Sequence, residues 1–274
     1  MVRTLWTAAS GMIGQQNNVD TIANNLANVN TVGYKSERNE FKSLLYQTLQ
    51  TRTTTANGEN KPISAQVGLG VRNASITSQF TQGAFLESAS PTAFAIGGEG
   101  FFCVKGEDGE NYYTRNGDFT FALGGNNTLK LATSDGLPVL NTAGQPIQLN
   151  AAQYNANRIT VDETGQLMYP DADNNAQPIA GMQIALFQFQ NPAGLNKEGD
   201  SLYSVTAASG QPLNEATNAN LEKSTIRQGY LEGSNVQVAD EMVNLIIAQR
   251  AYEMNSKAVQ AADTMMQEAN ELRR

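Results

Sequence analysis

The stretch LWTAASGMIGQQNNVDTIANNLANV, residues 5–29, decides the fold of this chain. Two rows of residues recur in it at intervals of seven, the second row three places after the first: Leu5, Met12, Val19 and Leu26, then Ala8, Gln15, Ile22 and Val29. These are the a and d positions of a heptad repeat, which predicts a helix packed along a coiled-coil seam. Thr31-Val32-Gly33 then predicts the end of that helix, because a β-branched pair and a glycine disfavour its continuation.

The last forty residues carry a second heptad. Its rows are Val238, Leu245, Tyr252, Val259 and Met266, with Ala248, Asn255, Ala262 and Ala269 three places after four of them. Ser234-Asn235 can cap a helix here, and Asp240-Glu241 place carboxylates near its positive end. A helix over 236–272 would be about 55 Å long at ~1.5 Å per residue. Two such helices cannot bury both apolar stripes alone, so we expect the remainder to face neighbouring subunits.

Between the helices the period changes to that of strands. Turn signals recur at Asp108-Gly109, Asn116-Gly117, Gly124-Gly125, Asp135-Gly136, Gly144 and Gly165. Runs of β-forming residues lie between or after them, at Phe101–Val104, Tyr112–Thr114, Phe119–Phe121 and Ile184–Phe189. Short strands at this spacing predict an antiparallel all-β domain.

The predicted fold class is therefore α+β, with an inserted antiparallel all-β domain. Because both helices leave the same domain, we expect them to form an antiparallel coiled-coil-like pair. The predicted divisions are an N-terminal assembly helix, an extended arm or linker, a β-rich outer domain, a return linker and a C-terminal assembly helix, over residues 1–35, 36–90, 91–210, 211–235 and 236–274.

The net charge of −8 is concentrated in the middle of the chain. Residues 91–220 hold 5 basic and 13 acidic side chains, whereas the two flanks are nearly neutral. An acidic middle repels nucleic acid and anionic membranes, so neither is an expected partner. No apolar run approaches the ~18 residues of a membrane span, so we expect no membrane insertion. The N-terminus lacks the apolar core and cleavage site of a Sec signal, so export would need another route.

The residues that carry most enzyme chemistry are missing. The chain has no histidine, which removes the usual general base and imidazole metal ligands. Its one cysteine, Cys103, sits in an apolar run and is expected to be buried and inert. The segment 171–175 resembles a calcium loop, but Ala176 and Met182 stand where such a loop needs Gly and Glu. We therefore predict no catalytic residue, cofactor or metal.

Four asparagines, Asn24, Asn25, Asn28 and Asn30, crowd the predicted end of the first helix. Asparagine lowers helix propensity, so one interpretation is a frayed end leading to the turn at Gly33. The other is a set of amides that bind backbone at subunit contacts. Composition alone does not decide between them.

Several motifs together resemble the bacterial flagellar rod and hook proteins, and within them the distal-rod branch. In the N-terminal region they are LWTAASGM (5–12) and ANNLANVNTVGYK (23–35). The middle contributes GEGFF (98–102), YTRNG (113–117) and NPAGL (191–195). The C-terminal region contributes GYLEGSNV (229–236), EMVN (241–244) and QRAYEMNSKA (249–258). The likeness covers essentially the whole chain.

The resemblance implies a structural subunit of the distal rod, the drive shaft of the flagellum. Such subunits leave the cytoplasm through the flagellar type III export apparatus and polymerise in the periplasm into a hollow tube that carries torque from motor to hook. Their implied partners are copies of themselves, neighbouring rod and hook proteins, and the bushing rings. The segment 46–67 occupies the place of a stretch linked in this family to rod straightness.

Three other readings remain open. A proximal-rod or hook subunit would share the same ends. A secreted β-rich adhesin would need no heptads, and a hydrolase would need a base that the chain does not offer.

Overall fold

The computed structural model describes residues 2–50, 65–171, 175–218 and 220–272, and divides into two compact units. The helical unit comprises Met1–Ala27, Glu37–Ser78 and Gln237–Arg274, and the β unit comprises Asn28–Ser36 and Gln79–Val236. Two helices and many antiparallel strands confirm the predicted α+β class.

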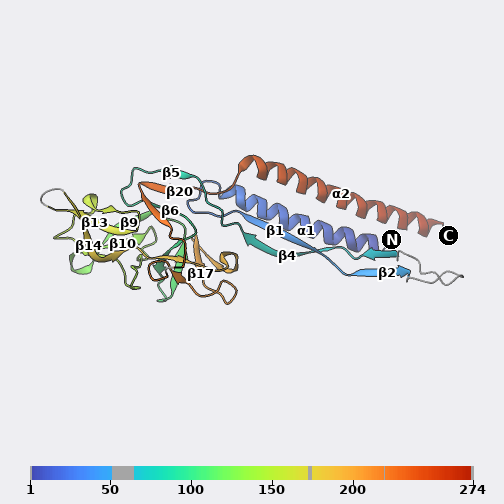
Figure 1. Cartoon of the computed structure of the whole chain (residues 1–274). Helices are drawn as coiled ribbons and strands as arrows, with labels where there is room; N and C mark the ends of the chain where they lie inside the picture. The colour runs from blue at the N-terminus through green and yellow to red at the C-terminus, as the bar shows by residue number, and fades with distance from the viewer. Residues whose placement is uncertain (1, 51–64, 172–174, 219, 273–274) are drawn as a thin grey trace. The chain divides into compact units, whose positions relative to one another are not determined.

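The helical unit is built on two helices that lie side by side, α1 (Val2–Ala27) and α2 (Val238–Glu271) (Figure 1). A Cβ placed on Gly11 would lie 2.8 Å from Nδ2 of Asn255. Asn25, fourteen residues after Gly11, donates to Glu241, which lies fourteen residues before Asn255. The helices are therefore antiparallel, and a residue without a side chain lets them come close at Gly11.

The first helix ends earlier than the heptad predicts. Its last residue is Ala27, so Val29 lies outside the helix and the predicted boundary at residue 35 is wrong as a helix end. The chain instead turns, as Thr31 N donates to Asn28 O at 3.2 Å and Tyr34 N donates to Thr31 O at 3.3 Å. The asparagines explain the early stop, because their side chains compete for backbone groups near a helix end.

The second helix begins two residues later than expected, at Val238. Its first turn carries Asp240 and Glu241, where carboxylates interact favourably with the helix dipole.

The predicted arm contains two strand pairs, and this corrects its description as a linker. β1 (Glu37–Ser43) pairs antiparallel with β4 (Val71–Ser78), and both lie against α1. β2 (Tyr46–Gln50) pairs antiparallel with β3 (Ala65–Gly68). These strands are mostly exposed, so they lack the alternating apolar pattern by which a half-buried strand is recognised. Residues 51–64 of the arm lie outside the described residues.

A six-stranded sheet organises the β unit, in the order β16-β17-β8-β7-β15-β18. Its strands are β16 (Asn196–Gly199), β17 (Leu202–Ser204), β8 (Asn111–Thr114), β7 (Phe101–Lys105), β15 (Leu186–Gln188) and β18 (Leu213–Asn214). The central strand β7 is the apolar run that the sequence marks, and its side chains are buried on both faces. Phe102 and Val104 belong to one apolar cluster and Phe101 and Cys103 to the other, as the two-residue period of a strand requires.

Smaller sheets complete the β unit. Two have three strands: β9 (Phe119–Gly124), β10 (Thr128–Thr133) and β11 (Gln148–Asn150), and β12 (Thr160–Val161), β13 (Gln166–Pro170) and β14 (Ala176–Gln183). Two have two strands: β6 (Phe94–Gly97) with β19 (Thr225–Gln228), and β5 (Phe85–Glu87) with β20 (Tyr230–Glu232).

The boundaries of the β unit differ from those predicted. The expected return linker, 211–235, contributes β18, β19 and β20, and the unit also takes up residues 28–36. β19 and β20 have only four and three residues and pair with strands more than a hundred residues away, so they leave no local period to detect.

The buried thiol of Cys103 gives a simple test of this core. Its side chain is fully buried, and burial raises its pKa to about 12. We expect a thiol-reactive disulfide reagent to leave the folded protein unmodified at pH 8 and to label one thiol per chain once denaturant unfolds it. Rapid labelling of the native protein would contradict the structure of β7.

Candidate assembly interface and its junction

The predicted N-terminal seam lies on the covered side of α1. Ala8 and Ile22 are buried, and the first row of the heptad is half-buried: Leu5, Met12, Val19 and Leu26. The heptad therefore marks the face of α1 that packs within its own unit.

The predicted C-terminal seam is less covered. Leu245, Val259 and Met266 are half-buried, whereas Val238 and Tyr252 are exposed, the latter to 42%. The most deeply buried residues of α2 are Ala248 and Ala262, from the second row of the heptad. Small residues thus sit deepest in the packed face of α2, and large apolar side chains lie toward its edges.

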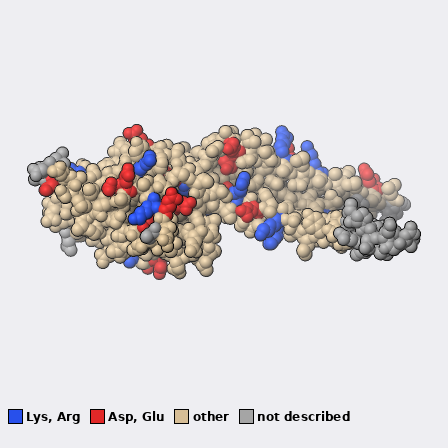
Figure 2. Space-filling view, viewed as in Figure 1, with Lys and Arg blue, Asp and Glu red and all other residues tan. Residues whose placement is uncertain are grey.

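The helices also carry apolar side chains that no other described residue covers. Each is at least half exposed: Trp6 and Ile13 on α1, and Met242, Val243, Ile246, Ile247, Met254 and Met265 on α2. Charged residues are only 16% of the chain, and wide areas between them on the face in Figure 2 carry none. Apolar surface on this scale marks an interaction site on a folded protein.

Asn25 is buried, whereas the other three motif asparagines are not. Its amide donates to Glu37 O at 2.8 Å and to Glu241 Oε1 at 3.2 Å, and its oxygen accepts from Glu37 N at 2.8 Å. One buried amide therefore joins the end of α1, the start of β1 and the start of α2. Burial raises the pKa of Glu241, and the hydrogen bond from Asn25 opposes that shift.

The other motif residues lie in or near the turn after α1. Asn28 Oδ1 accepts from Thr31 Oγ1 at 3.1 Å, while Asn24 and Asn30 are exposed. Gly33 is buried with φ of +70°, and a Cβ there would lie 2.7 Å from the backbone of Arg115. Only glycine fits this position without strain.

A buried ionic cluster, formed by Lys35, Arg115 and Glu232, ties together the segments next to the helices. Glu232 accepts from Lys35 Nζ at 2.6 Å and from Arg115 Nη1 at 3.3 Å, and Gly83 N donates to it at 3.0 Å. We call these three residues the junction cluster. Lys35 lies eight residues after α1 and Glu232 six residues before α2.

The junction cluster holds two cations for one carboxylate. All three side chains are at most 2% exposed, and Arg115 Nε has no hydrogen-bond partner among the described residues. The Phe101 ring, 4.9 Å from the guanidinium carbon, offers partial compensation. Burial lowers the pKa of Lys35 even though Glu232 opposes the shift. Lys35 and Arg115 therefore repel each other in a buried site, and the carboxylate of Glu232 is the group of the cluster that offsets this repulsion.

Sequence reasoning did not find this cluster. Lys35 and Glu232 stand inside motifs that carry the family resemblance, but Lys35 and Glu232 are 197 residues apart in the chain. A charged side chain in a strand or turn is normally read as exposed, and no periodicity links the three positions.

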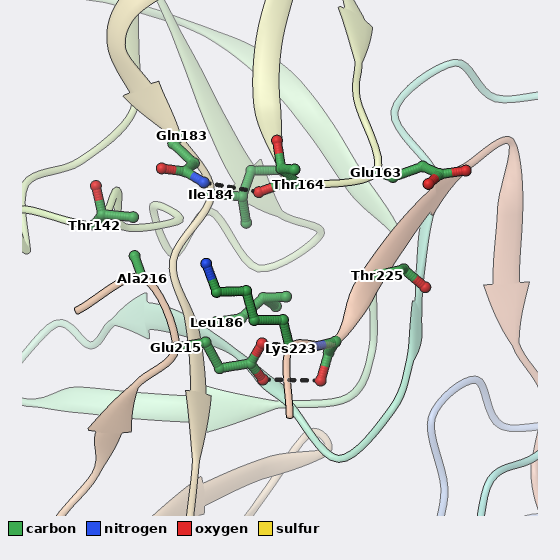
Figure 3. Close-up of a pocket in the computed structure, with 11 residues that line it drawn as sticks. Thr142, Glu163, Thr164, Gln183, Ile184, Leu186, Glu215, Ala216, Lys223 and Thr225 are labelled. Carbon is green, nitrogen blue, oxygen red and sulfur yellow. Dashed lines mark hydrogen bonds between the residues drawn. The ribbon is translucent and has the colours of Figure 1, made fainter. Parts of the chain in front are cut away.

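A polar pocket of about 400 Å³ opens in the β unit (Figure 3). Gln183 donates to Thr164 O at the upper edge of the pocket, and the Lys223 side chain extends toward Gln183. Glu215 accepts from Ser224 N at 2.7 Å, from Ser224 Oγ at 2.8 Å and from Gln188 Nε2 at 2.9 Å. Its carboxylate is thus engaged in holding the segment around Ser224 to β15.

Within the described ranges, no group of three or more histidine, cysteine, aspartate or glutamate side chains is placed to hold a metal ion. No helix of the described chain has the length and apolarity to cross a bilayer.

A β unit flanked in sequence by terminal helices with uncovered apolar faces defines the class of axial structural subunits. Comparison with known proteins agrees at both ends and in the middle. The profile "Flagella basal body rod protein" matches residues 5–35, "Flagellar hook protein FlgE/F/G D1 domain" matches 95–169, and "Flagellar basal body rod FlgEFG protein C-terminal" matches 227–272.

Relatives matched over nearly the whole chain include several proteins of one name. Flagellar basal-body rod protein FlgG of Borreliella burgdorferi is 44% identical over all of both chains. That of Agrobacterium fabrum is 40% identical over 96% of this chain and 97% of its own, and that of Bacillus subtilis is 35% identical over all of both. The chain belongs to the FlgG family of flagellar basal-body rod proteins. It is a structural subunit of the distal rod and is located in the flagellar basal body.

The junction cluster predicts unequal costs for removing its members. Glu232→Gln leaves two buried cations without their carboxylate and should lower the free energy of unfolding by about 3–5 kcal/mol. Urea unfolding followed by circular dichroism measures this. The matched control is Glu253→Gln, since its ion pair with Arg250 is exposed and is worth under about 1 kcal/mol.

Lys35→Met should cost less than Glu232→Gln, because one cation and one carboxylate remain paired. The pKa of Lys35 is lowered from 10.5, so the protonated form of Lys35 is disfavoured in the folded state and destabilises the parent protein. This destabilisation of the parent fades as pH rises toward 10.5, because Lys35 then loses its proton more readily in the folded state than in the unfolded state. The stability of the parent relative to Lys35→Met should therefore increase with pH. Equal costs for the two variants would contradict the charge balance described here.

Proposed function

We propose that this subunit polymerises through α1 and α2 into the hollow axial tube of the distal rod, which transmits torque from motor to hook. The observation that carries this proposal is the uncovered apolar surface of the two helices. Burial of such surface is the main driving force for association. The role is purely structural, and the protein needs no cofactor.

Assembly would complete a coiled-coil packing that one chain only begins. The exposed Val238 and Tyr252 belong to the α2 heptad and would be covered by helices of neighbouring copies. The β unit, which holds the acidic excess, would lie outside the tube, where like charges remain solvated. Neighbouring rod and hook proteins, the surrounding bushing rings and the type III export apparatus are the proposed partners.

The alternative of a proximal-rod or hook subunit is less well supported than the distal rod. The profiles that match the middle and the C-terminal end are shared by hook and rod members, which favours a common architecture. The full-length relatives favour the distal rod, because the FlgG proteins of Borreliella burgdorferi and Bacillus subtilis match the chain from end to end.

Ile247 offers a test of the uncovered face. It is 61% exposed, so Ile247→Asp should leave the subunit folded but place a carboxylate in an apolar contact, at a cost of several kcal/mol per interface. We expect loss of polymers in a sedimentation assay with unchanged circular dichroism of the monomer. The exposed Gln260→Asp serves as a control on the same helix. Normal polymers from Ile247→Asp would argue against this face.

The arm is proposed to stiffen the tube. Within the arm, β2 pairs with β3, and the exposed Leu45, which precedes β2, and Tyr46 and Leu49 of β2 would contact an adjacent subunit. Such bridging would resist sliding between rows of subunits. Deletion of residues 48–64 should therefore give polymers that form but curve or flex, as seen by electron microscopy. Straight, stiff tubes from the deletion would reduce the segment to a linker.

A further inference from the structure

We propose that a groove between α1 and α2 receives the Trp6 indole of a second copy of this chain and thereby sets the axial stagger between neighbouring subunits. The inference rests on the proposed polymerisation and deepens it by naming one contact.

The groove lies within the helical unit and has a volume of about 370 Å³. Its lining residues are Gln16, Val19, Gln249, Tyr252 and Glu253. Val19 and the Tyr252 ring supply apolar surface, while the two amides and the carboxylate supply polar groups. Pockets from ~300 Å³ upward hold small organic ligands, so one large aromatic side chain fits.

Trp6 matches this lining in both respects. It is the only tryptophan of the chain and is 72% exposed. The indole combines a large apolar surface with one N–H, which needs an acceptor when buried. Glu253 accepts one hydrogen bond from Arg250 at 3.0 Å, and its carboxylate has further acceptor capacity. Ile13 and the exposed methionines of α2 have no such donor.

The occupant must come from another copy. Trp6 and the groove residues Gln16 and Val19 lie on one continuous helix, ten and thirteen residues apart. At ~1.5 Å per residue this separation is about 15–20 Å, which no side chain spans. If neighbouring α1 helices run parallel, the same distance is the axial offset between the two copies.

A disulfide between copies tests the contact directly. The double variant Trp6→Cys, Gln249→Cys is polymerised under reducing conditions and then oxidised. We expect a ladder of linked subunits on a non-reducing gel, because each copy offers one partner to each neighbour. Neither single variant should give a ladder, and the buried Cys103 should add no background.

A second readout keeps the tryptophan in place. In parent polymers Trp6 emission should shift to the blue, and quenching by iodide should fall several-fold relative to the monomer. Gln249→Phe fills the groove, so Trp6 should stay accessible to iodide and the critical concentration should rise at least about tenfold. Gln260→Phe, exposed elsewhere on α2, is the matched control and should resemble the parent.

The outcomes separate the two proposals. Polymers that form while Trp6 stays accessible overturn the groove contact and leave polymerisation standing. Trp6 that is protected without a ladder, and with no effect of Gln249→Phe, means that it is buried against another surface and also overturns the contact. A parent chain that forms no polymer overturns the proposed function itself.

Discussion

Close packing of two antiparallel helices is the constraint on which the rest of this subunit depends. Gly11 has no side chain where Asn255 approaches, and Ala248 and Ala262 are the most deeply buried positions of α2. When the smallest residues occupy the packed faces, the larger apolar ones are displaced toward the edges and the outside. Ile246, Ile247 and Met254 are therefore exposed, although their chemistry suits an interior. The surface available for assembly is a consequence of how the pair packs.

A second constraint concerns how the chain enters and leaves its β unit. The segments 28–36 and 230–236 meet there, and Gly33 N donates to Glu232 O at 2.8 Å. Backbone bonds alone allow such segments to slip, whereas a buried carboxylate shared by Lys35 and Arg115 has only one satisfactory arrangement. Buried ionic groups contribute little net stability, but breaking one is costly. The junction cluster thus favours a single geometry where a rod subunit must bear load.

The two units divide the chemistry of the chain between them. The β unit has a continuous apolar core built around β7 and holds the acidic excess. The helical unit carries no net charge and has much uncovered apolar surface. A solvated, negatively charged unit resists non-specific association, which favours the helical unit as the site of the proposed polymer contacts. This division agrees with a family in which one subunit type builds an ordered axial structure.

The sequence by itself determined the helices, the β domain and the family. Heptads span four or more turns and strands repeat between turn residues. Both are local patterns, so they can be recognised from the sequence without knowing which residues are in contact. The buried Ala8, Ile22 and Ala248 follow from the same heptads. The strands of the arm could not be found this way, because their exposed residues carry no period.

Only the tertiary structure decided which atoms meet across long separations. The bonds of Asn25 to Glu37 and Glu241 and the pairing of Lys35 with Glu232 join residues 12 to 216 positions apart. The same holds for the α1/α2 groove, whose lining residues come from opposite ends of the chain. A pattern in sequence reports which face of an element is apolar. It does not report which element lies opposite, because that depends on the closure of the whole fold.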